Sequence, residues 1–375
     1  MLKKILNKVL KILRSKKIFS FPKKNSIIIF DDINSNLIEE LILKNKNYTI
    51  LHNYQIIYLP ILLYSIFFLK YPRYAYQIAF LKYTNAKYVI NYHDDAIKIS
   101  IPCKLVGCKL ILIQNGLRDQ YCFPELKDNK KWEADYYFVQ SEDWKNWIKD
   151  KIDTKFIVTG SLKNNCFERK NFKKIKQLVW ISHFTENKVI SAKSKKSRQN
   201  ISWNEDVYEV NKICLGILKK FCSIKKLSLV VLPKYKNQSF QEKNFYKEFN
   251  LNLIENSNTS WRSSYEILDS DSLIVSTNST LGLELFSRNF KVVFFGLRSV
   301  FLNDPSMRFG WPLKTKDTGP FWCNLVNENE MFNTLESVLN MDQENWNKKI
   351  SDFKSVMMYD YKNKKILDFF SSIKV

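Results

Sequence analysis

Residues 271–284, Asp271-Ser-Leu-Ile-Val-Ser-Thr-Asn-Ser-Thr-Leu-Gly-Leu-Glu284, decide the fold of this chain. The apolar run 273–275 is typical of a strand that is covered on both faces, as strands of parallel sheets are. The turn 276–280 consists of small hydroxyl and amide residues, and apolar residues then recur with helical spacing over residues 281–285. The sequence therefore predicts a buried strand that leads through a polar turn directly into a helix.

Such a turn can bind an anion, because the first N–H groups of a helix lack partners inside it and the helix dipole favours negative charge there. Ser279 and Thr280 add hydroxyl donors. Glu284 lies one helical turn further on, where its carboxylate can accept hydrogen bonds from a sugar diol such as a ribose. The alternative is an ordinary helix start without a ligand, which Asn278 or Ser279 caps with its side chain.

Length and composition predict a packed protein of two domains. With 375 residues the chain exceeds a single ordinary domain, and two domains of roughly 150 residues fit this length. Hydrophobic residues make up 45% of the chain and aromatic residues 15%, which excludes a disordered tail.

The net charge of +23 fits a nucleic acid, an anionic membrane or a phosphorylated substrate as partner. Neither a helix-turn-helix nor an aromatic and basic RNA-binding signature is found, so we expect no nucleic-acid partner. Seven cysteines without a C-x-x-C pair and only three histidines argue against a zinc site. We therefore expect reduced thiols, no bound metal, no cofactor and, without a recognisable signal peptide, a cytoplasmic protein.

Residues 1–20 are predicted to form a basic amphipathic helix. Its apolar stripe consists of Leu2, Ile5, Leu6, Val9, Leu10 and Leu13. Its basic residues, with no acidic residue between them, are Lys3, Lys4, Lys8, Lys11, Arg14, Lys16 and Lys17. Such a helix can lie on an anionic membrane, at about 1 kcal/mol per basic residue, so we expect peripheral attachment to the inner face of the cytoplasmic membrane. The alternative is a helix that docks on the protein with a solvated lysine face.

A second apolar run, residues 56–69, is too short to span a bilayer and is broken by Pro60. We predict that it forms a core helix.

Short apolar strands alternate with helical segments, a pattern typical of βαβ units and parallel sheets. The predicted strands are residues 27–30, 48–51, 88–90, 109–113, 136–139 and 156–158, then 178–181, 227–232, 251–254, 273–275 and 291–295. The predicted fold is α/β with two Rossmann-like doubly wound domains, residues 25–165 and 175–325, and a deep cleft between them. Residues 328–375 are predicted to be helical and to pack back across both domains.

Polar residues follow the strands of the first domain, and ligands of open α/β sheets bind beyond the carboxyl ends of strands. Asn115, Arg118 and Asp119 follow one strand. Arg118 can hold an acidic group through two parallel hydrogen bonds, and Asp119 can take a proton from a substrate hydroxyl; the alternative is a surface ion pair. His93 and Asp95 follow a neighbouring strand, where either can act as a base or in a helix cap.

The domain junction and the second sheet supply further polar residues. Gly160 and Ser161 end the first domain, and Ser182 and His183 end the first strand of the second. His183 can contact a phosphate or a departing oxygen, or can be a buried structural histidine. Lys234 ends the next strand, where it either balances phosphate charge or is a solvated loop lysine.

Residues 304–312, Asp-Pro-Ser-Met-Arg-Phe-Gly-Trp-Pro, place Arg308 among aromatic rings and turn formers. Rings of this kind stack on sugars or bases while the arginine contacts charge, so the segment is a candidate binding loop. Its aromatic density can equally form a minor core under a long loop.

The order of these motifs resembles that of GT-B glycosyltransferases: two Rossmann-like halves, a Gly-Ser hinge, Ser-His after the first strand of the second domain, Leu-Pro-Lys, and a Ser/Thr turn followed by Glu284. The resemblance covers about residues 26–322. Residues 278–284 and 308–312 are similar to stretches of bacterial capsule and surface-carbohydrate transferases, including those that use CMP-activated acidic sugars.

This resemblance implies the transfer of a sugar from a nucleotide-activated donor to a polysaccharide or lipid-linked acceptor. The donor-binding residues that it implies are Gly160, Ser161, Ser182, Lys234, Ser279, Thr280, Glu284 and Arg308. The acceptor-binding residues are His93, Asn115 and Arg118, and the catalytic candidates are Asp95, Asp119 and His183. Metal is usually unnecessary in such enzymes, because basic residues and helix dipoles stabilise the leaving nucleotide. The Glu-Asp-Gly stretch of ketodeoxyoctonate transferases is absent, so donor and stereochemistry stay open.

Other functions remain open. Residues 158–160 and 182–186 resemble the hinge and the UDP-binding strand of nonhydrolysing UDP-sugar 2-epimerases, although the run of acidic residues usual in the first domain of that enzyme is not evident. A phosphotransferase that uses a CDP-polyol donor has the same fold. The last alternative is a basic binding module without catalysis.

Overall fold

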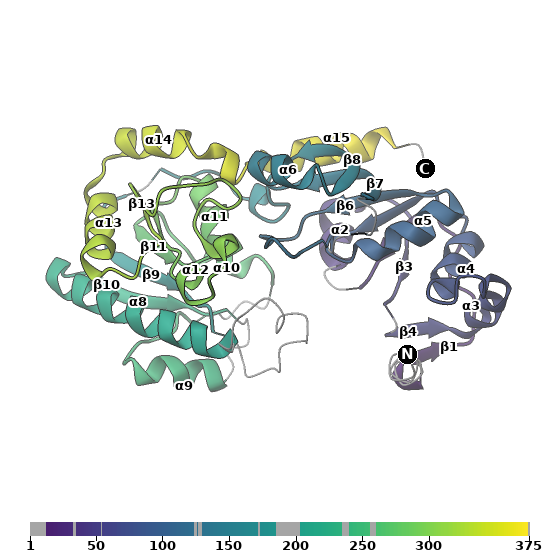
Figure 1. The fold of residues 1–375 in the computed structure, drawn as a ribbon, viewed down its shortest axis with the longest axis horizontal. Helices are drawn as coiled ribbons and strands as arrows, with labels where there is room; N and C mark the ends of the chain where they lie inside the picture. Colours follow the sequence, from purple (N-terminus) through teal and green to yellow (C-terminus); the bar gives the residue numbers. More distant parts are fainter. Residues whose placement is uncertain are drawn as a thin grey trace.

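The computed structural model describes residues 13–32, 35–53, 55–123, 126, 130–171, 173–184, 203–234, 240–255 and 260–373. These residues form two α/β lobes side by side, and the C-terminal helices run across one edge of both (Figure 1). The predicted fold class, two Rossmann-like domains, is confirmed.

The N-terminal domain contains six parallel strands in the order β3-β2-β5-β6-β7-β8. In β2, Ile28 and Phe30 pack into the core on one face of the sheet, and Ile27 and Ile29 pack into the core on the other. Burial on both faces explains why these strands appear as continuous apolar runs in the sequence. The strands are β2 (Ile27–Phe30), β3 (Thr49–Leu51), β5 (Tyr88–Asn91), β6 (Lys109–Ile113), β7 (Trp132–Val139) and β8 (Ile152–Val158), and the helices are α2 (Ser35–Leu41), α3 (Leu59–Tyr64), α4 (Ala75–Tyr83), α5 (Ser100–Val106) and α6 (Glu142–Ile148).

The C-terminal domain has the strand order β10-β9-β11-β12-β14-β13, which is parallel except for the pair β13 and β14. The predicted strand, turn and helix of residues 271–284 are β11 followed by α11. The strands are β9 (Gln177–Ile181), β10 (Ser228–Leu232), β11 (Ser272–Ser276), β12 (Val292–Phe295), β13 (Thr318–Gly319) and β14 (Trp322–Cys323), and the helices are α8 (Trp203–Lys225), α9 (Phe240–Glu248), α10 (Ser263–Glu266), α11 (Thr280–Ser287) and α12 (Arg298–Phe301).

The C-terminal segment is helical, as predicted, and crosses from one domain to the other. Helices α13 (Glu328–Asn340) and α14 (Gln343–Ser351) lie on the C-terminal domain, and α15 (Lys364–Ser372) lies on the N-terminal domain (Figure 1). Phe369 of α15 packs edge-on against Tyr136 of β7, with 4.6 Å between ring centroids. These ring contacts anchor the end of the chain on the first sheet.

Gly160 lies in the hinge, which we define as the two segments where the chain passes between the domains, around residues 160 and 359. It has a φ of +77° and pairs with Tyr359 in an antiparallel bridge. A Cβ at this position would lie 2.1 Å from the carbonyl oxygen of Met358. Gly160, predicted to bind the donor, therefore serves the close approach of two backbone segments.

Three predicted segments differ from the structure. Residues 1–12 lie outside the described residues, but Lys16–Ile18, predicted to be helical, form strand β1, which runs parallel to β4 (Ile56–Tyr58). The predicted core helix 56–69 consists of β4, α3 and the 3-10 helix η1 (Ser65–Phe68), with several exposed side chains. Residues 251–254 make only an isolated bridge through Leu253. None of the described helices combines the length and apolar character needed to cross a membrane.

Candidate active site between the domains

The carboxyl ends of β9 and β11 define the candidate site. The two strands are neighbours, but after β9 the sheet continues outward to β10, whereas after β11 it continues to β12 on the other side. Such a switch point leaves an opening beyond the strand ends, which is where open α/β sheets bind ligands. Ser182 and His183 follow β9, and residues 277–280 follow β11, so two predicted motifs meet there.

A cavity of about 360 Å³ fills this opening and reaches the N-terminal domain. The N-terminal domain contributes Leu117, Arg118 and Asp119 to its wall. Of the predicted site residues, those that line the cavity are Arg118, Asp119, Ser182, His183, Lys234, Ser279, Thr280 and Arg308. The predicted site residues outside it are His93, Asp95, Asn115, Gly160, Ser161 and Glu284.

Helix α11 begins at the cavity wall without a side-chain cap. Ser279 is the N-cap residue, but its side chain makes no capping hydrogen bond. The N–H groups of Thr280 and Leu281 have no hydrogen-bond partner among the residues that the structure describes. The alternative of a side-chain-capped helix start is therefore contradicted, and the positive end of the helix dipole is available to an anion.

Basic side chains outnumber acidic ones in this cavity. Arg118, Lys234, Arg298 and Arg308 line it, and Asp119 is the acidic residue among its described lining residues. Burial, and then the charge of Arg298, lower the pKa of Lys234. A group of cations that destabilise one another in this way favours a negatively charged ligand.

Arg298 also lines the site and was not among the residues predicted from the sequence. It is buried at the start of α12, and its Nη1 donates to the Oδ1 of Asn278 (3.1 Å), in the turn before α11. This bond holds the guanidinium beside the uncapped helix start. A signal was present in the sequence, because Arg298 closely follows the predicted strand 291–295 at the ligand edge of the sheet.

His183 is neutral and has a nitrogen without a partner. Burial, followed by the charges of Arg298 and Lys234, lowers the pKa of its imidazole well below 6.5. Its Nε2 is shielded from solvent and forms no hydrogen bond among the described residues. Buried polar atoms are usually paired, so this nitrogen is a candidate contact for a ligand in the cavity. A neutral imidazole can donate or accept at that nitrogen, depending on its tautomer.

Arg118 forms a buried ion pair with Asp94, which does not line the cavity. Its Nε lies 3.1 and 3.2 Å from the two carboxylate oxygens of Asp94, which also accept a hydrogen bond from the hydroxyl of Tyr137. Burial alone would lower the pKa of the Arg118 guanidinium, but the Asp94 carboxylate more than offsets this and raises it. Asn115, predicted to bind the acceptor, accepts from Nη2 of Arg118 (2.6 Å) and so positions it. The alternative of a surface pair between Arg118 and Asp119 is therefore wrong.

The two predicted catalytic carboxylates differ in position. Asp119 lines the cavity, and its Oδ1 accepts from the N–H of Tyr121 (2.9 Å), which fixes the side chain. Asp95 is exposed, lies 3.9 Å from Nη2 of Arg118 and is outside the cavity. His93 is half-buried and also lies outside the cavity. Of the two carboxylates, Asp119 is the one placed to reach a bound substrate.

Ser182 lines the cavity, but its hydroxyl is used inside the protein. It donates to Glu242 (2.6 Å) and accepts from the hydroxyl of Tyr246 (2.9 Å). The same Glu242 oxygen accepts from the backbone N–H of Lys234 (2.9 Å). Ser182 therefore ties the end of β9 to the end of β10 and helps to position Lys234; the structure does not support direct donor binding by its hydroxyl.

Glu284 and Ser161, both predicted to bind the donor, bind each other. The hydroxyl of Ser161 donates to Oε1 of Glu284, and the hydroxyl of Tyr265 donates to Oε2 (2.6 Å). The Glu284 residue is 3% exposed and does not line the cavity. Because both carboxylate oxygens have hydrogen-bond partners at the hinge, the structure does not support the predicted ribose contact.

The loop of residues 304–312 forms one wall of the cavity and a contact between the domains. Arg308 lines the cavity and pairs with Asp317 at the surface. Trp311 lies edge-on to Trp147 of α6, with 5.4 Å between ring centroids. The predicted binding loop is thus also part of the interdomain interface.

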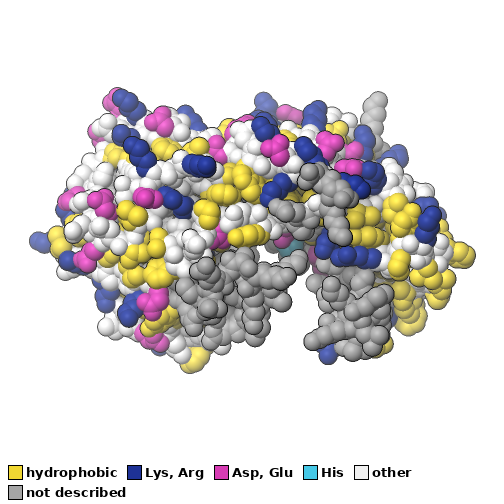
Figure 2. Space-filling view, in the orientation of Figure 1, with side chains coloured by type: hydrophobic (Ala, Val, Ile, Leu, Met, Phe, Trp, Pro, Cys, Tyr) yellow, Lys and Arg dark blue, Asp and Glu magenta, His cyan; other side chains and the backbone are white. Residues whose placement is uncertain are grey.

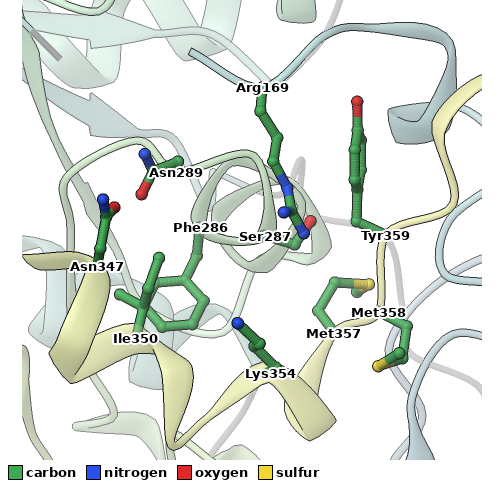
Figure 3. Close-up of a pocket in the computed structure, with 10 residues that line it drawn as sticks. All are labelled: Arg169, Phe286, Ser287, Asn289, Asn347, Ile350, Lys354, Met357, Met358 and Tyr359. Carbon is green, nitrogen blue, oxygen red and sulfur yellow. The ribbon is translucent and has the colours of Figure 1, made fainter. Parts of the chain in front are cut away.

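A second cavity, of about 280 Å³, lies behind the hinge at the other end of α11 (Figure 3). Phe286, Met357 and Met358 make much of its wall apolar. Arg169 and Lys354 line it near the C-terminal end of α11, where positive charge balances the helix dipole. None of its described lining residues is acidic or a histidine, so the interdomain cavity is the better candidate for acid and base chemistry. Among the described residues, no group of three or more His, Cys, Asp or Glu side chains is arranged to hold a metal ion.

Comparisons with known proteins agree with this architecture. The UDP-GlcNAc 2-epimerase of Neisseria meningitidis, solved with UDP-GlcNAc bound, is 14% identical, covers 92% of this chain and 99% of its own, and has a TM-score of 0.51. A Listeria monocytogenes protein described as a "putative UDP-N-acetylglucosamine 2-epimerase" is 12% identical, covers 94% of this chain and 98% of its own, and has a TM-score of 0.52. The wall teichoic acid polymerase TagF is 11% identical, covers 93% of this chain and 89% of its own, and has a TM-score of 0.48.

At these identities the first two similarities establish the fold, which is the GT-B arrangement of two Rossmann-like domains. No curated protein sequence matches the chain. One family model matches residues 111–374, which include the end of β6, all of β7 and β8 and the whole C-terminal domain. The chain therefore belongs to the family described as "putative O-antigen biosynthesis protein".

Proposed function

We propose that the protein is a metal-independent glycosyltransferase that moves a sugar from a nucleotide-activated donor to a surface polysaccharide or a lipid-linked acceptor. The observation that carries the proposal is the uncapped start of α11, whose unpaired amides lie at the wall of a basic cavity between two Rossmann-like domains. A donor phosphate has the charge and the acceptor oxygens that this site requires. The family description supports a product among surface carbohydrates.

The donor is proposed to bind with a phosphate at the N–H groups of Thr280 and Leu281. Arg298 and Lys234 then lie beside it, and Arg308 closes the same cavity. Arg118 and Arg308 are paired with Asp94 and Asp317. The other two lining cations, Arg298 and Lys234, together with the helix dipole suit a donor with two negative charges. A nucleoside diphosphate sugar has both charges on its phosphates, whereas a CMP-linked acidic sugar has one on the phosphate and one on the sugar.

Transfer breaks the bond between the anomeric carbon and a phosphate oxygen of the donor, and forms a bond between the anomeric carbon and an acceptor oxygen. Asp119 takes the proton of the acceptor hydroxyl. Arg298, Lys234 and the dipole of α11 stabilise the charge that develops on the leaving phosphate, which is the role that a metal has in other transferases. His183, which is neutral, donates a hydrogen bond from Nε2 to the departing oxygen.

The proposal is tested in two steps. Thermal-shift measurements with CMP, UDP, GDP and CDP identify the nucleotide, since a ligand at about 100 times its Kd adds about 2.7 kcal/mol of stability. The matching nucleotide-sugars are then incubated with lipid-linked acceptors in buffer with EDTA, and free nucleotide is expected to appear only when an acceptor is present. Conversion of UDP-GlcNAc to its 2-epimer without an acceptor would instead identify an epimerase. Transfer of a polyol phosphate from a CDP-polyol would identify a phosphotransferase.

A further inference from the structure

The N-terminal domain has an apolar surface at its outer edge, away from the candidate active site. We call it the outer apolar edge and define it as Phe19, Phe21, Leu63, Ile66, Phe67 and Leu69. More than half of each of these residues is exposed, with 81% for Phe19 and 79% for Phe67. Hydrophobic side chains gather in the space-filling view at the edge of the N-terminal domain that carries α3 (Figure 2).

The exposure follows from the sequence pattern of α3 and η1. Leu63, Ile66 and Phe67 are spaced by three and four residues, which places them on one side of a helical segment. Ile61 and Ser65 point the other way and are buried. No charged residue occurs from residue 59 to residue 69, so the segment has apolar residues on its outer side where a protein surface normally has polar ones.

The two parts of the edge meet at the end of α4. Phe21 stacks on Tyr83 of α4, with 4.6 Å between ring centroids. The neighbouring Lys82 lies over the ring of Phe68 in η1, at 5.1 Å from its centroid, and Lys24 lies over Tyr83 at 5.0 Å. In this arrangement lysine stems cover aromatic rings while their ammonium groups remain at the surface.

The segments that form the edge carry charge of one sign. The sequence has no acidic residue from Met1 to Phe30 or from Leu41 to His93. The exposed basic residues of these segments include Lys16, Lys23, Lys24, Lys70, Arg73 and Lys82. These basic residues form the basic rim of the edge, and an apolar surface with such a rim matches a partner that offers both hydrocarbon and negative charge.

We propose that the outer apolar edge docks on an anionic lipid membrane. Phe19, Phe67 and their neighbours enter the headgroup boundary, and the basic rim pairs with anionic headgroups. Helices α14 and α15 lie on the opposite side of the molecule from β1 and β4, so docking here leaves the hinge facing away from the lipid (Figure 1).

The experiment is co-flotation of the full-length protein with vesicles of phosphatidylcholine, with and without phosphatidylglycerol. Replacing Ile66→Ser together with Phe67→Ser removes the most exposed part of η1 and is expected to weaken binding to anionic vesicles about tenfold or more. Phe240→Ser is the control, because Phe240 is 77% exposed, about as much as Phe67, but lies on α9 of the C-terminal domain. Phe67→Trp keeps a ring that favours the interface and is expected to bind like the wild type.

Charge is tested with a second matched pair. Lys23→Gln with Lys24→Gln is expected to weaken binding to anionic vesicles several-fold, whereas Lys348→Gln with Lys349→Gln, on α14, is expected to have no effect. Far-UV circular dichroism and the melting temperature confirm that each variant is folded. Unchanged vesicle binding of the Ile66 and Phe67 variant would overturn the proposal. So would a wild-type dimer that this variant dissociates while neither protein binds vesicles, because the edge would then be a contact between copies of the chain.

Discussion

The backbone N–H of Leu117, in the N-terminal domain, donates a hydrogen bond to the hydroxyl oxygen of Thr280, the first residue of α11 in the C-terminal domain (3.0 Å). This bond joins the loop that carries Arg118 and Asp119 to the helix start that carries the unpaired amides. A Cβ at Gly116 would lie 3.2 Å from the same hydroxyl oxygen, so glycine eases this approach. This contact, together with the Trp147–Trp311 ring contact, therefore helps to set the distance between the two sides of the cavity.

Thr280→Val is expected to loosen this alignment, because the N–H of Leu117 then has no acceptor. The expected loss is about 1–2 kcal/mol of unfolding free energy and about tenfold in kcat/KM. Thr280→Ser retains the hydroxyl and serves as the control. Urea denaturation and steady-state kinetics measure both effects, and a Val variant that equals the Ser variant in both would show that the bond is unimportant.

Arg298→Gln is expected to weaken nucleotide binding about tenfold or more, since it removes a buried charge beside the proposed phosphate position. Isothermal titration calorimetry measures the Kd. Arg169→Gln, in the cavity behind the hinge, is the control that leaves the Kd unchanged. Equal effects of the two substitutions would argue against a phosphate at the start of α11.

Asp119→Asn is expected to lower kcat by about 100-fold or more and to leave the nucleotide Kd unchanged, as loss of a general base does. Asp95→Asn lies outside the cavity and is expected to change kcat by less than about threefold. Rate measurements at saturating donor separate the two residues. A larger loss of kcat in Asp95→Asn than in Asp119→Asn would assign the base to Asp95.

His183 makes stability depend on pH. Its folded-state pKa lies well below the 6.5 of an exposed imidazole, so the unfolded chain binds more protons between the two values. The stability that the neutral His183 contributes is fully present above about pH 6.5. As the pH is lowered below this value, the free energy of unfolding falls by up to about 1.4 kcal/mol per pH unit. Urea unfolding between pH 4.5 and about 7.5 is expected to show this slope in the wild type and in His93→Gln, but a smaller slope in His183→Gln. An unchanged slope in His183→Gln would show that the imidazole is not neutral in the folded protein.

Glu284→Gln separates a hinge role from a donor-binding role. The amide offers one carbonyl oxygen to two hydroxyl donors, Ser161 and Tyr265, so a loss of about 1–3 kcal/mol of stability is expected. The nucleotide Kd is expected to change by less than about threefold, because the carboxylate does not line the cavity. A stable variant that no longer binds nucleotide would restore the predicted ribose contact.

The sequence predicted best those elements whose residue pattern follows from their own burial. The runs at residues 27–30 and 109–113 are strands with these bounds, because burial on both faces requires continuous apolar residues. The segment 271–284 likewise predicted both β11 and the start of α11. Strand β1, residues 16–18, was not predicted, because its pairing with β4 depends on a segment 40 positions away in the chain.

Roles that depend on distant partners were not predictable from local pattern. Glu284 looked like a ribose ligand, but Ser161 of the other domain takes one of its oxygens. Arg118 looked like a surface residue or an open anion clamp, but Asp94 holds it from behind. Residues that the sheet edge alone brings together, such as His183 and Ser279, were predictable, because strand order places strand ends side by side.

The most direct test is a crystal structure of the protein with the nucleotide that stabilises it most. We expect phosphate density within hydrogen-bond distance of the N–H groups of Thr280 and Leu281, with Arg298 beside it. Density for the phosphate in the cavity of Arg169 and Lys354, or at any place outside the interdomain cavity, would contradict this expectation.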